Sequence, residues 1–376
     1  MRRIEMVDLR SQYEKIKGEI DRGIEEVMES CAFVKGSKVG EFEKHLAEYL
    51  GVRHVIAVGN GSDALTIALM ALGLQKGDEV ITSAFSFVSA VEAISLLGLK
   101  PVLADVEHDT MNISVDAVRR AVTERTRAIV PVHLFGQNAD MEPLLQLAKE
   151  RGLYVIEDAC QSIGSAYQFR DGRKGMSGCM GDMGCTSFFP SKNLGCYGDG
   201  GALFTNDGAF AAKARSIANH GMGEHYHYDT VGINSRLDSI QAAVLDAKLT
   251  HLDEYTAARR AAAAAYDSAL RGAEGLVLPT KAPYTTHVYH QYTVRIDGKD
   301  RDEVRKRLAD RGVPSMIYYP IPLHLQRAYR TLGYKEGDFP VSERLASTVL
   351  SLPMHTELDG EQLQYVADSL IAALRI

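Results

Sequence analysis

The sequence predicts an α/β protein with a large, mainly parallel sheet and a smaller C-terminal α+β domain. From about residue 50 to residue 190, short runs of β-branched residues alternate with longer segments of helical periodicity. Strands separated by helices of about ten to fifteen residues form right-handed βαβ units, whose parallel strands are covered on both faces. After Pro279 the elements become shorter and mixed. We therefore expect two domains, at 1–248 and 249–376.

The expected elements follow one another along the chain. In the large domain, β-branched runs predict strands at 54–58, 79–82, 101–105, 128–133 and 153–157. Helical periodicity predicts helices at 63–72, 88–97, 114–123 and 140–151, and long helices across 235–270. In the C-terminal domain the same criteria predict strands at 290–296 and 315–319, and helices at 301–311 and 360–374.

The composition indicates an ordinary globular protein of the cytoplasm. Of the 376 residues, 45% are hydrophobic and 24% are charged, and the net charge is −7. This charge argues against a general nucleic-acid-binding surface. The N-terminus lacks the apolar core of a signal peptide, and the longest apolar stretch, 64–74, is far shorter than the roughly 20 residues that span a bilayer. We expect neither a nucleic-acid partner nor a membrane partner.

The cysteines and histidines form no recognisable metal or disulfide pattern. The five cysteines include no C-x-x-C pair, so reduced thiols are expected. His220, His225 and His227 lie close together but have no acidic or thiol neighbours at ligand spacing. We therefore expect no metal ion.

Three clusters carry candidate chemistry, and the first two follow predicted strands, where an open parallel sheet binds its ligands. The first, Gly59-Asn-Gly-Ser-Asp63, precedes a helix. Ser62 and the amides of Gly61 and Asp63 suit a phosphate, although an ordinary turn with a helix N-cap explains the motif equally well. The second cluster contains Asp158, whose carboxylate could keep a heteroaromatic nitrogen protonated, cap a helix or bind a metal.

The third cluster surrounds Lys192, within 186–201. Aromatic residues and glycines flank this lysine, which is unusual for a solvated surface lysine. Partial desolvation lowers the pKa of a lysine and so favours the neutral amine that forms a Schiff base. The motifs of P-loop nucleotide binding, serine hydrolases and zinc proteases are absent from the sequence.

Taken together, four ordered motifs resemble those of the DegT/StrS-type nucleotide-sugar aminotransferases, which are pyridoxal-phosphate enzymes of fold type I. The motifs are Asn60-Gly-Ser-Asp-Ala64, Glu157-Asp-Ala-Cys-Gln-Ser162, Ser187-Phe-Phe-Pro-Ser-Lys192 and Gly232-Ile-Asn-Ser-Arg-Leu-Asp238. The resemblance extends from about residue 7 to residue 354.

The resemblance implies a role for each matching residue. Lys192 would form the Schiff base with the cofactor, and Asp158 would pair with the pyridinium nitrogen. Phe87 would lie over the ring, and Gln161 would lie near the ring hydroxyl. The residues implied to hold the phosphate are Ser62, Asp63, Ser187 and, from the neighbouring subunit of a homodimer, Asn234.

The resemblance also implies the substrates, which are L-glutamate as donor and a UDP- or dTDP-linked keto sugar as acceptor. The residues of these motifs most resemble those of the branch that aminates UDP-2-acetamido-2-deoxy-3-oxo-glucuronate for the synthesis of surface polysaccharide. Arg236 would then suit the sugar carboxylate, with an ion pair to Asp238 or Glu224 as the structural alternative. Tyr319 and His324 are further substrate candidates, although a hydrophobic turn explains them as well.

Three other functions remain open from the sequence. A 4-keto sugar aminotransferase would use the same cofactor chemistry. A related pyridoxal-dependent sugar dehydratase would carry histidine in place of the Schiff-base lysine, and Lys192 argues against it. A non-catalytic regulatory relative would be expected to have damage at Lys192 or Asp158, and both residues are present.

Overall fold

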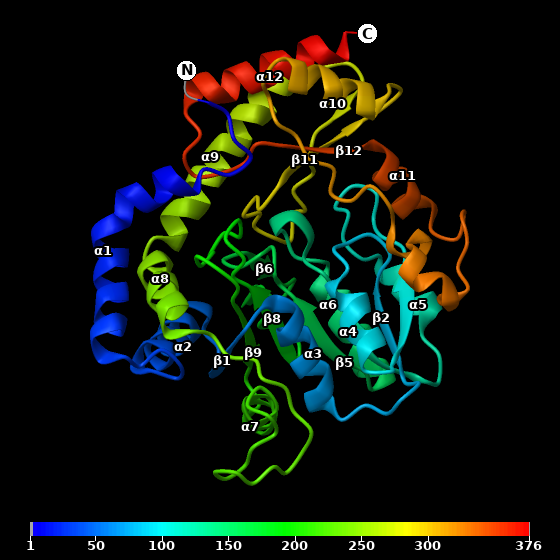
Figure 1. Ribbon diagram of the computed structural model, residues 1–376. Coiled ribbons are helices and arrows are strands. Elements are labelled where there is room, and N and C mark those ends of the chain that lie inside the picture. The colour runs from blue at the N-terminus through cyan, green and yellow to red at the C-terminus, as the bar shows by residue number, and fades with distance from the viewer. Residues whose placement is uncertain (1–2, 376) are drawn as a thin grey trace.

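The computed structural model describes residues 3–375, and its centre is a seven-stranded sheet (Figure 1). The strand order is β1-β9-β8-β5-β4-β2-β3; β9 is antiparallel to both of its neighbours and the other pairs are parallel. The large, mainly parallel sheet predicted from the sequence is confirmed. The strands are β1 (His54–Val58), β2 (Glu79–Ser83), β3 (Lys100–Ala104), β4 (Thr126–Val130), β5 (Tyr154–Asp158), β8 (Met183–Ser187) and β9 (Gly201–Thr205).

Helices cover both faces of this sheet because its strands are apolar on both faces. Val80 and Ile156 pack on the side of one helical layer, whereas Ile81 and Val155, one residue away in each strand, pack on the other side. The first layer contains α3 (Gly61–Leu72), α4 (Ser89–Leu96) and α7 (Gly208–Ile217). The second contains α5 (Val115–Ala121) and α6 (Met141–Arg151).

Two N-terminal helices, which the sequence analysis did not predict, complete this part of the molecule. They are α1 (Leu9–Ser30) and α2 (Ser37–Leu50), and both lie against α8 (Ser239–Leu249) on one flank (Figure 1). The long helical region expected at 235–270 is divided at residues 250–251 into α8 and α9 (Leu252–Leu270). The proposed domain boundary at 248/249 falls in the last turn of α8, and we retain it as a proposal.

The C-terminal part is built on a small antiparallel sheet of order β10-β11-β12. Its strands are β10 (Leu276–Val277), β11 (Tyr292–Ile296) and β12 (Val349–Leu352), and its helices are α10 (Arg301–Asp310), α11 (Pro340–Thr348) and α12 (Gly360–Leu374). Helix α9 runs from α8 to α12, so it joins the two parts (Figure 1). Short 3-10 turns occur at η1 (Leu134–Gly136), η2 (Leu323–Leu325) and η3 (Arg327–Leu332).

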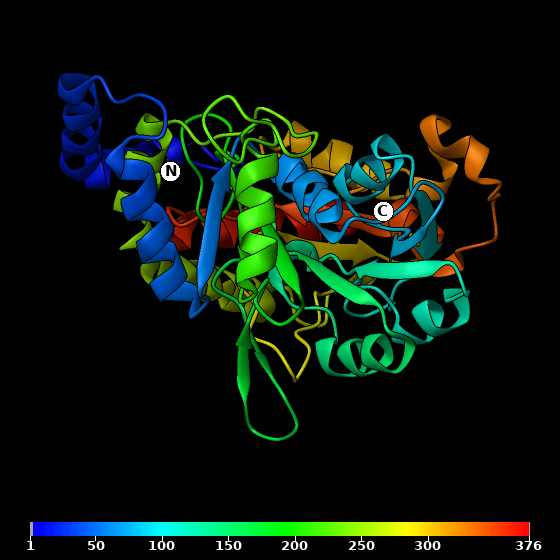
Figure 2. The same cartoon turned by 90° about the horizontal axis from the view of Figure 1, so that it is seen from below.

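The strand predicted at 315–319 is wrong. Only Met316 pairs there, through a single bridge to Ser351 of β12. Prolines at 314, 320 and 322 flank the segment, and a proline cannot donate a ladder hydrogen bond. The strand that lies beside β11 is instead β12, which the sequence analysis did not predict. A separate hairpin of β6 (Ala166–Gln168) and β7 (Lys174–Met176) projects from the body of the molecule (Figure 2).

Candidate active site

A pocket of about 470 Å³ lies at the carboxyl edge of the large sheet, where this edge meets the C-terminal part of the chain. The segments after β1, β2, β4 and β8, together with the end of β5, supply most of its wall, as expected for an open parallel sheet. Segments 290–291 and 318–319 close the other side. The lining residues that had been proposed from the sequence are Gly61, Ser62, Phe87, Asp158, Gln161, Ser187, Lys192 and Tyr319.

One end of the pocket is suited to an anion. Helix α3 begins there, and the first amides of a helix have no partner within the helix, so they attract negative charge. Asn60 caps the helix by accepting a hydrogen bond from the Asp63 amide at 2.8 Å. Ser62 Oγ lies 2.7 Å from Ser89 Oγ, and Ser187 also faces the pocket. The amide and hydroxyl donors at this end fit a phosphate group.

Glycine at position 61 is required by close packing at this end of the pocket. A Cβ atom there would lie 2.7 Å from Ser187 Cβ and 3.0 Å from Cys160 Sγ. The start of α3 and the end of β8 therefore approach each other at backbone distance, which brings the hydroxyls and amides of both segments to the same place.

Asp158 also lines the pocket, at the end of β5. Its backbone is fixed in the sheet, because its N–H donates to Pro131 O at 2.9 Å and its carbonyl accepts from the His133 amide at 2.9 Å. Its Oδ1 accepts a hydrogen bond from the Cys160 amide at 3.1 Å. The side chain is 6% exposed and faces the pocket. A buried carboxylate in this position is available for a cationic ring nitrogen.

Lys192 lies in the same pocket, on the loop that joins β8 to β9. Burial lowers the pKa of its ammonium group, although the nearby Asp158 carboxylate and Cys160 act in the opposite direction. The neutral amine is the nucleophilic form of a lysine, so this environment favours Schiff-base formation.

Aromatic side chains form another part of the pocket wall. Phe87 lines the pocket and is still 54% exposed, so one face of its ring is free for a planar ligand. Its ring centroid lies 6.1 Å from that of Tyr319. Gln161 donates to the Tyr319 hydroxyl at 3.1 Å and accepts from the Phe135 amide at 2.7 Å. Burial raises the pKa of Tyr319, so its phenol stays protonated.

Four residues proposed from the sequence do not line this pocket: Asp63, Asn234, Arg236 and His324. The amide of Asp63 donates to Asn60, and its carboxylate accepts from Ser235 Oγ at 2.6 Å. His324 is 1% exposed, and its Nε2 lies 2.9 Å from Glu343 Oε1. The phosphate contact of Asp63 and the substrate contact of His324 stay predictions.

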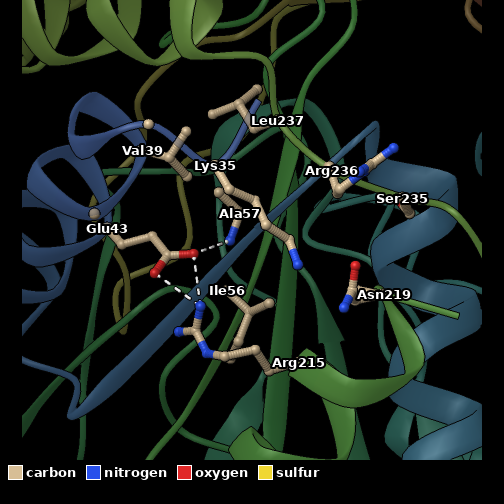
Figure 3. A pocket seen from close by; sticks show the side chains of 13 residues that line it. Lys35, Val39, Glu43, Ile56, Ala57, Arg215, Asn219, Ser235, Arg236 and Leu237 are labelled. Atoms are coloured by element: carbon tan, nitrogen blue, oxygen red, sulfur yellow. Dashed lines mark hydrogen bonds and ion pairs between the residues drawn. The ribbon is translucent and has the colours of Figure 1, made fainter. Parts of the chain in front are cut away.

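Arg236 lines a second pocket of about 310 Å³, and Figure 3 shows its surroundings. Arg215 pairs there with Glu43 at 3.1 Å, whereas Lys35 and Arg236 have no bond to the other side chains drawn (Figure 3). No ion pair between Arg236 and the nearby acidic residues at 224 and 238 is formed within residues 3–375. Asn234 is exposed and does not line the pocket of its own subunit, so its proposed contact concerns a second subunit.

The sequence analysis missed several residues of the pocket, among them Ser89 and His290. Ser89 follows β2, and the rule that ligands bind beyond strand ends could have indicated it. His290 comes from the C-terminal part, and no local signal marked it. It is 6% exposed, and burial together with Lys192 and Arg259 holds its pKa well below the usual value. The imidazole beside Lys192 is therefore neutral.

The part of the chain that the structure describes contains no group of three or more His, Cys, Asp or Glu side chains placed to hold a metal ion. Within the same range, no helix combines the length and the apolar character needed to cross a membrane.

The profile of the DegT/DnrJ/EryC1/StrS aminotransferase family matches residues 14–371. The chain belongs to this family. This aminotransferase is 47% identical over 372 residues to a Geobacillus stearothermophilus protein named pleiotropic regulatory protein, with 98% of this chain and 97% of the other covered. It is 44% identical to the UDP-2-acetamido-2-deoxy-3-oxo-D-glucuronate aminotransferase of Pseudomonas aeruginosa, with 98% and 99% covered. A dTDP-3-amino-3,4,6-trideoxy-alpha-D-glucose transaminase of Streptomyces venezuelae is 40% identical, with 98% and 95% covered.

Solved structures agree with this assignment. Streptomyces venezuelae DesV in complex with a ketimine intermediate superposes with a TM-score of 0.95 at 40% identity, and all of both chains is covered. A Bacillus subtilis protein with bound cofactor PMP superposes with a TM-score of 0.88 at 31% identity, with 96% of this chain and 82% of the other covered. Aminotransferases of this family use pyridoxal phosphate, and the fold type I assignment is confirmed.

The pocket fits this cofactor on its own geometry. A phosphate requires an end with amide and hydroxyl donors, which α3, Ser62 and Ser187 supply. A pyridinium nitrogen requires an anion, and the Asp158 carboxylate lines the pocket. An aldehyde requires a neutral amine, and burial lowers the pKa of Lys192 in the direction of that form. Phe87 offers the exposed ring face that a planar heterocycle stacks against.

Proposed function

We propose that this aminotransferase moves the amino group of L-glutamate onto the C3 ketone of a nucleotide-linked sugar, in the synthesis of a surface polysaccharide. The observation that carries the proposal is the single pocket that contains a pKa-lowered lysine, a buried carboxylate and an anion-binding helix start. Two of the relatives described above have names that specify amination at position 3 of the sugar. The names of these two relatives also favour amination at C3 of the sugar over amination at C4.

The residues of the pocket divide the work of the reaction. Bound pyridoxal phosphate supplies a ring that takes up the electron pair released when a Cα proton leaves. The Asp158 carboxylate would hold the ring nitrogen in its positive form. Lys192 would hold the cofactor, and its Nζ would act as the base that takes up the donor proton and as the acid that gives it back. Ser62, Ser89 and Ser187 would bind the phosphate.

The sugar that we favour is UDP-2-acetamido-2-deoxy-3-oxo-glucuronate, and Arg236 is the residue that we assign to its carboxylate. In segment 234–238, burial alternates: Ser235 and Leu237 are buried, whereas Asn234 and Arg236 are more exposed. Alternating residues of an extended segment face the same side. Asn234 and Arg236 therefore face the same, more exposed side of the segment. We assign both to the active site of a neighbouring subunit. Tyr319 contributes from the opposite wall of that pocket.

We accordingly propose a homodimer with shared active sites. Exposed apolar side chains next to segment 234–238 support this assembly: Phe33 and Val34 are 41% and 47% exposed, and Val231 is 81% exposed. Val34 forms a bridge with Asp238, so Val34 lies beside segment 234–238. Apolar patches of this kind mark protein contacts. The free cysteines among the described residues agree with a cytoplasmic location.

Mixing two inactive variants tests the shared site. A Lys192→Ala subunit still supplies Asn234, and an Asn234→Ala subunit still supplies Lys192. Half of the dimers in a statistical mixture are hybrids with one intact site each, so about a quarter of wild-type activity should return after unfolding and refolding together. If the refolded mixture is no more active than the separate variants, Asn234 does not contribute to the partner's active site.

Product analysis tests the substrate. The enzyme is incubated with L-glutamate and a panel of UDP- and dTDP-linked 3-keto and 4-keto sugars, and the products are identified by mass spectrometry. We expect amination of the UDP-linked 3-keto uronate, and Arg236→Gln should lower its kcat/KM much more than that of a 3-keto sugar without a carboxylate. Preferred amination of a 4-keto sugar would contradict the proposal.

A further inference from the structure

Lys248 of α8 is a buried lysine that the proposed reaction does not use. Its side chain is among the most buried in the protein, at 1% exposed. Its Nζ donates to Gly195 O at 2.8 Å and lies 4.3 Å from the centre of the Tyr197 ring. No carboxylate within residues 3–375 pairs with it. Burying a cation whose partners are a neutral carbonyl and a ring costs free energy, so packing alone does not explain why a lysine is found there.

Both partners of Lys248 belong to the loop that carries Lys192. Gly195 lies three residues after Lys192, and Tyr197 lies five residues after it. The same face of α8 holds this loop at a second point, since Gln241, seven residues before Lys248, accepts from the Tyr197 amide at 2.8 Å. Gln241 and Lys248, on one face of α8, therefore bond to Tyr197 and Gly195, the residues on either side of Cys196.

The loop transmits this restraint because it is closed and tightly packed. The Cys196 amide donates to Phe188 O at 2.8 Å, and the Lys192 amide donates to Phe189 O at 2.8 Å. A Cβ atom at Gly195 would lie 2.4 Å from Pro190 O, so Gly195 and Pro190 touch through their backbones. A displacement of Gly195 therefore moves Pro190, which lies two residues before Lys192.

We infer that Lys248 is a positioning residue for Lys192, acting from behind the pocket through the carbonyl of Gly195. The inference goes beyond the proposed function and rests on it in one respect, the role of Lys192 as the amine that bonds to the cofactor. Burial lowers the pKa of Lys248 to about 8, which agrees with a cation held away from water.

The test compares Lys248→Met, Lys248→Arg and a control, Lys299→Met. Methionine keeps the length of the side chain and removes the donor and the charge, whereas arginine keeps both. Lys299 also donates to a backbone carbonyl, Leu374 O at 2.7 Å, but lies in the C-terminal part away from the pocket. The readouts are the pH midpoint of the visible absorbance of the bound cofactor and the rate at which L-glutamate bleaches it.

For Lys248→Met we expect a shifted midpoint, because a displaced Lys192 lies at a different distance from Asp158 and Cys160, which act on its pKa. We also expect bleaching slowed on the order of tenfold, because a reacting group that is misplaced by a fraction of an ångström loses its alignment. Lys248→Arg should recover most of both properties, and Lys299→Met should leave both unchanged. Loss of thermal stability alone would not move the absorbance midpoint.

A Lys248→Met protein with the wild-type midpoint and bleaching rate overturns the inference. If this variant does not fold, Gln241→Met decides, because it removes the other hold of the same helix face on this loop. A shifted midpoint and slowed bleaching in Gln241→Met sustain the inference, and wild-type values of both overturn it. A wild-type protein that binds no cofactor, or whose cofactor bonds to another residue, contradicts the proposed function instead. The two failures are therefore distinguishable.

Discussion

Replacing Asp158 by asparagine should separate the chemical role of this residue from its structural role. Asparagine has nearly the same shape, and its side-chain oxygen can still accept the hydrogen bond from the Cys160 amide. The backbone bonds of residue 158 to Pro131 and His133 do not depend on the side chain. We therefore expect the free energy of unfolding of the cofactor-free protein to change by less than about 1 kcal/mol.

The effect on the reaction should be larger. A carboxylate beside a cation raises the pKa of that cation by about 1–3 units, and each unit corresponds to about 1.4 kcal/mol. Asparagine cannot provide this stabilisation to a pyridinium nitrogen, so the barrier should rise by about 1.4–4 kcal/mol. The rate of the glutamate half-reaction should fall by about 10- to 1,000-fold. Stopped-flow absorbance of the bound cofactor measures this rate, and urea unfolding measures stability.

Asp105 provides the matched control, since it also follows a strand of the same sheet. Its carboxylate accepts hydrogen bonds from the Val341 amide at 3.0 Å and from Ser342 N and Oγ at 2.9 and 2.6 Å. Asp105→Asn should lower stability by about 1–3 kcal/mol and leave the rate per cofactor-loaded site unchanged. An Asp158→Asn rate within twofold of wild type, at full cofactor loading, would refute the assigned role of Asp158.

Three further predictions concern packing, buried charge and pH. Gly61→Ala should weaken cofactor binding by more than about tenfold in a titration, because its Cβ meets Ser187 at 2.7 Å; Gly40→Ala, with no neighbour within 4 Å, should not. Glu157 accepts from three backbone amides and pairs with His133, so Glu157→Gln should lower the free energy of unfolding in urea by about 2–4 kcal/mol; a change below about 0.5 kcal/mol would contradict this. Burial lowers the pKa of His287 to about 3. Between about pH 6.5 and pH 3, His287 is therefore protonated in the unfolded chain and neutral in the folded chain. Stability should therefore fall as the pH falls through this window, and His287→Asn should make the fall shallower by about 1.4 kcal/mol per pH unit; an unchanged slope would contradict the prediction.

Local pattern was enough to predict the large sheet and the centre of the site. Strands β1, β2 and β4 are buried along most of their length, so each appears in the sequence as a short β-branched run between helices. Strands β8 and β9 have no such run and were not predicted. Asp158 and Lys192 were found because an acidic residue at a strand end and a lysine among aromatics and glycines are unusual in themselves.

The features that were missed depend on contacts between distant parts of the chain. Lys248 lies in an ordinary helical pattern, and only the packing of α8 against the loop of Lys192 gives it a role. His290 reaches the pocket because β11 begins beside it. Asp63 and His324 were proposed for the site from their positions in the sequence. In the fold, the Asp63 side chain bonds to Ser235 and the His324 side chain bonds to Glu343. Pairing of β11 with β12 likewise has no local signal.

The most direct test of the central claim is to find where the cofactor bonds to the chain. Reducing the yellow holoenzyme with borohydride fixes the cofactor to its lysine, and peptide mass spectrometry then locates the modification. The account predicts one modified peptide, at Lys192, and no modification in Lys192→Ala. A cofactor fixed to any other lysine, or a wild-type protein that retains none after reduction, would contradict it.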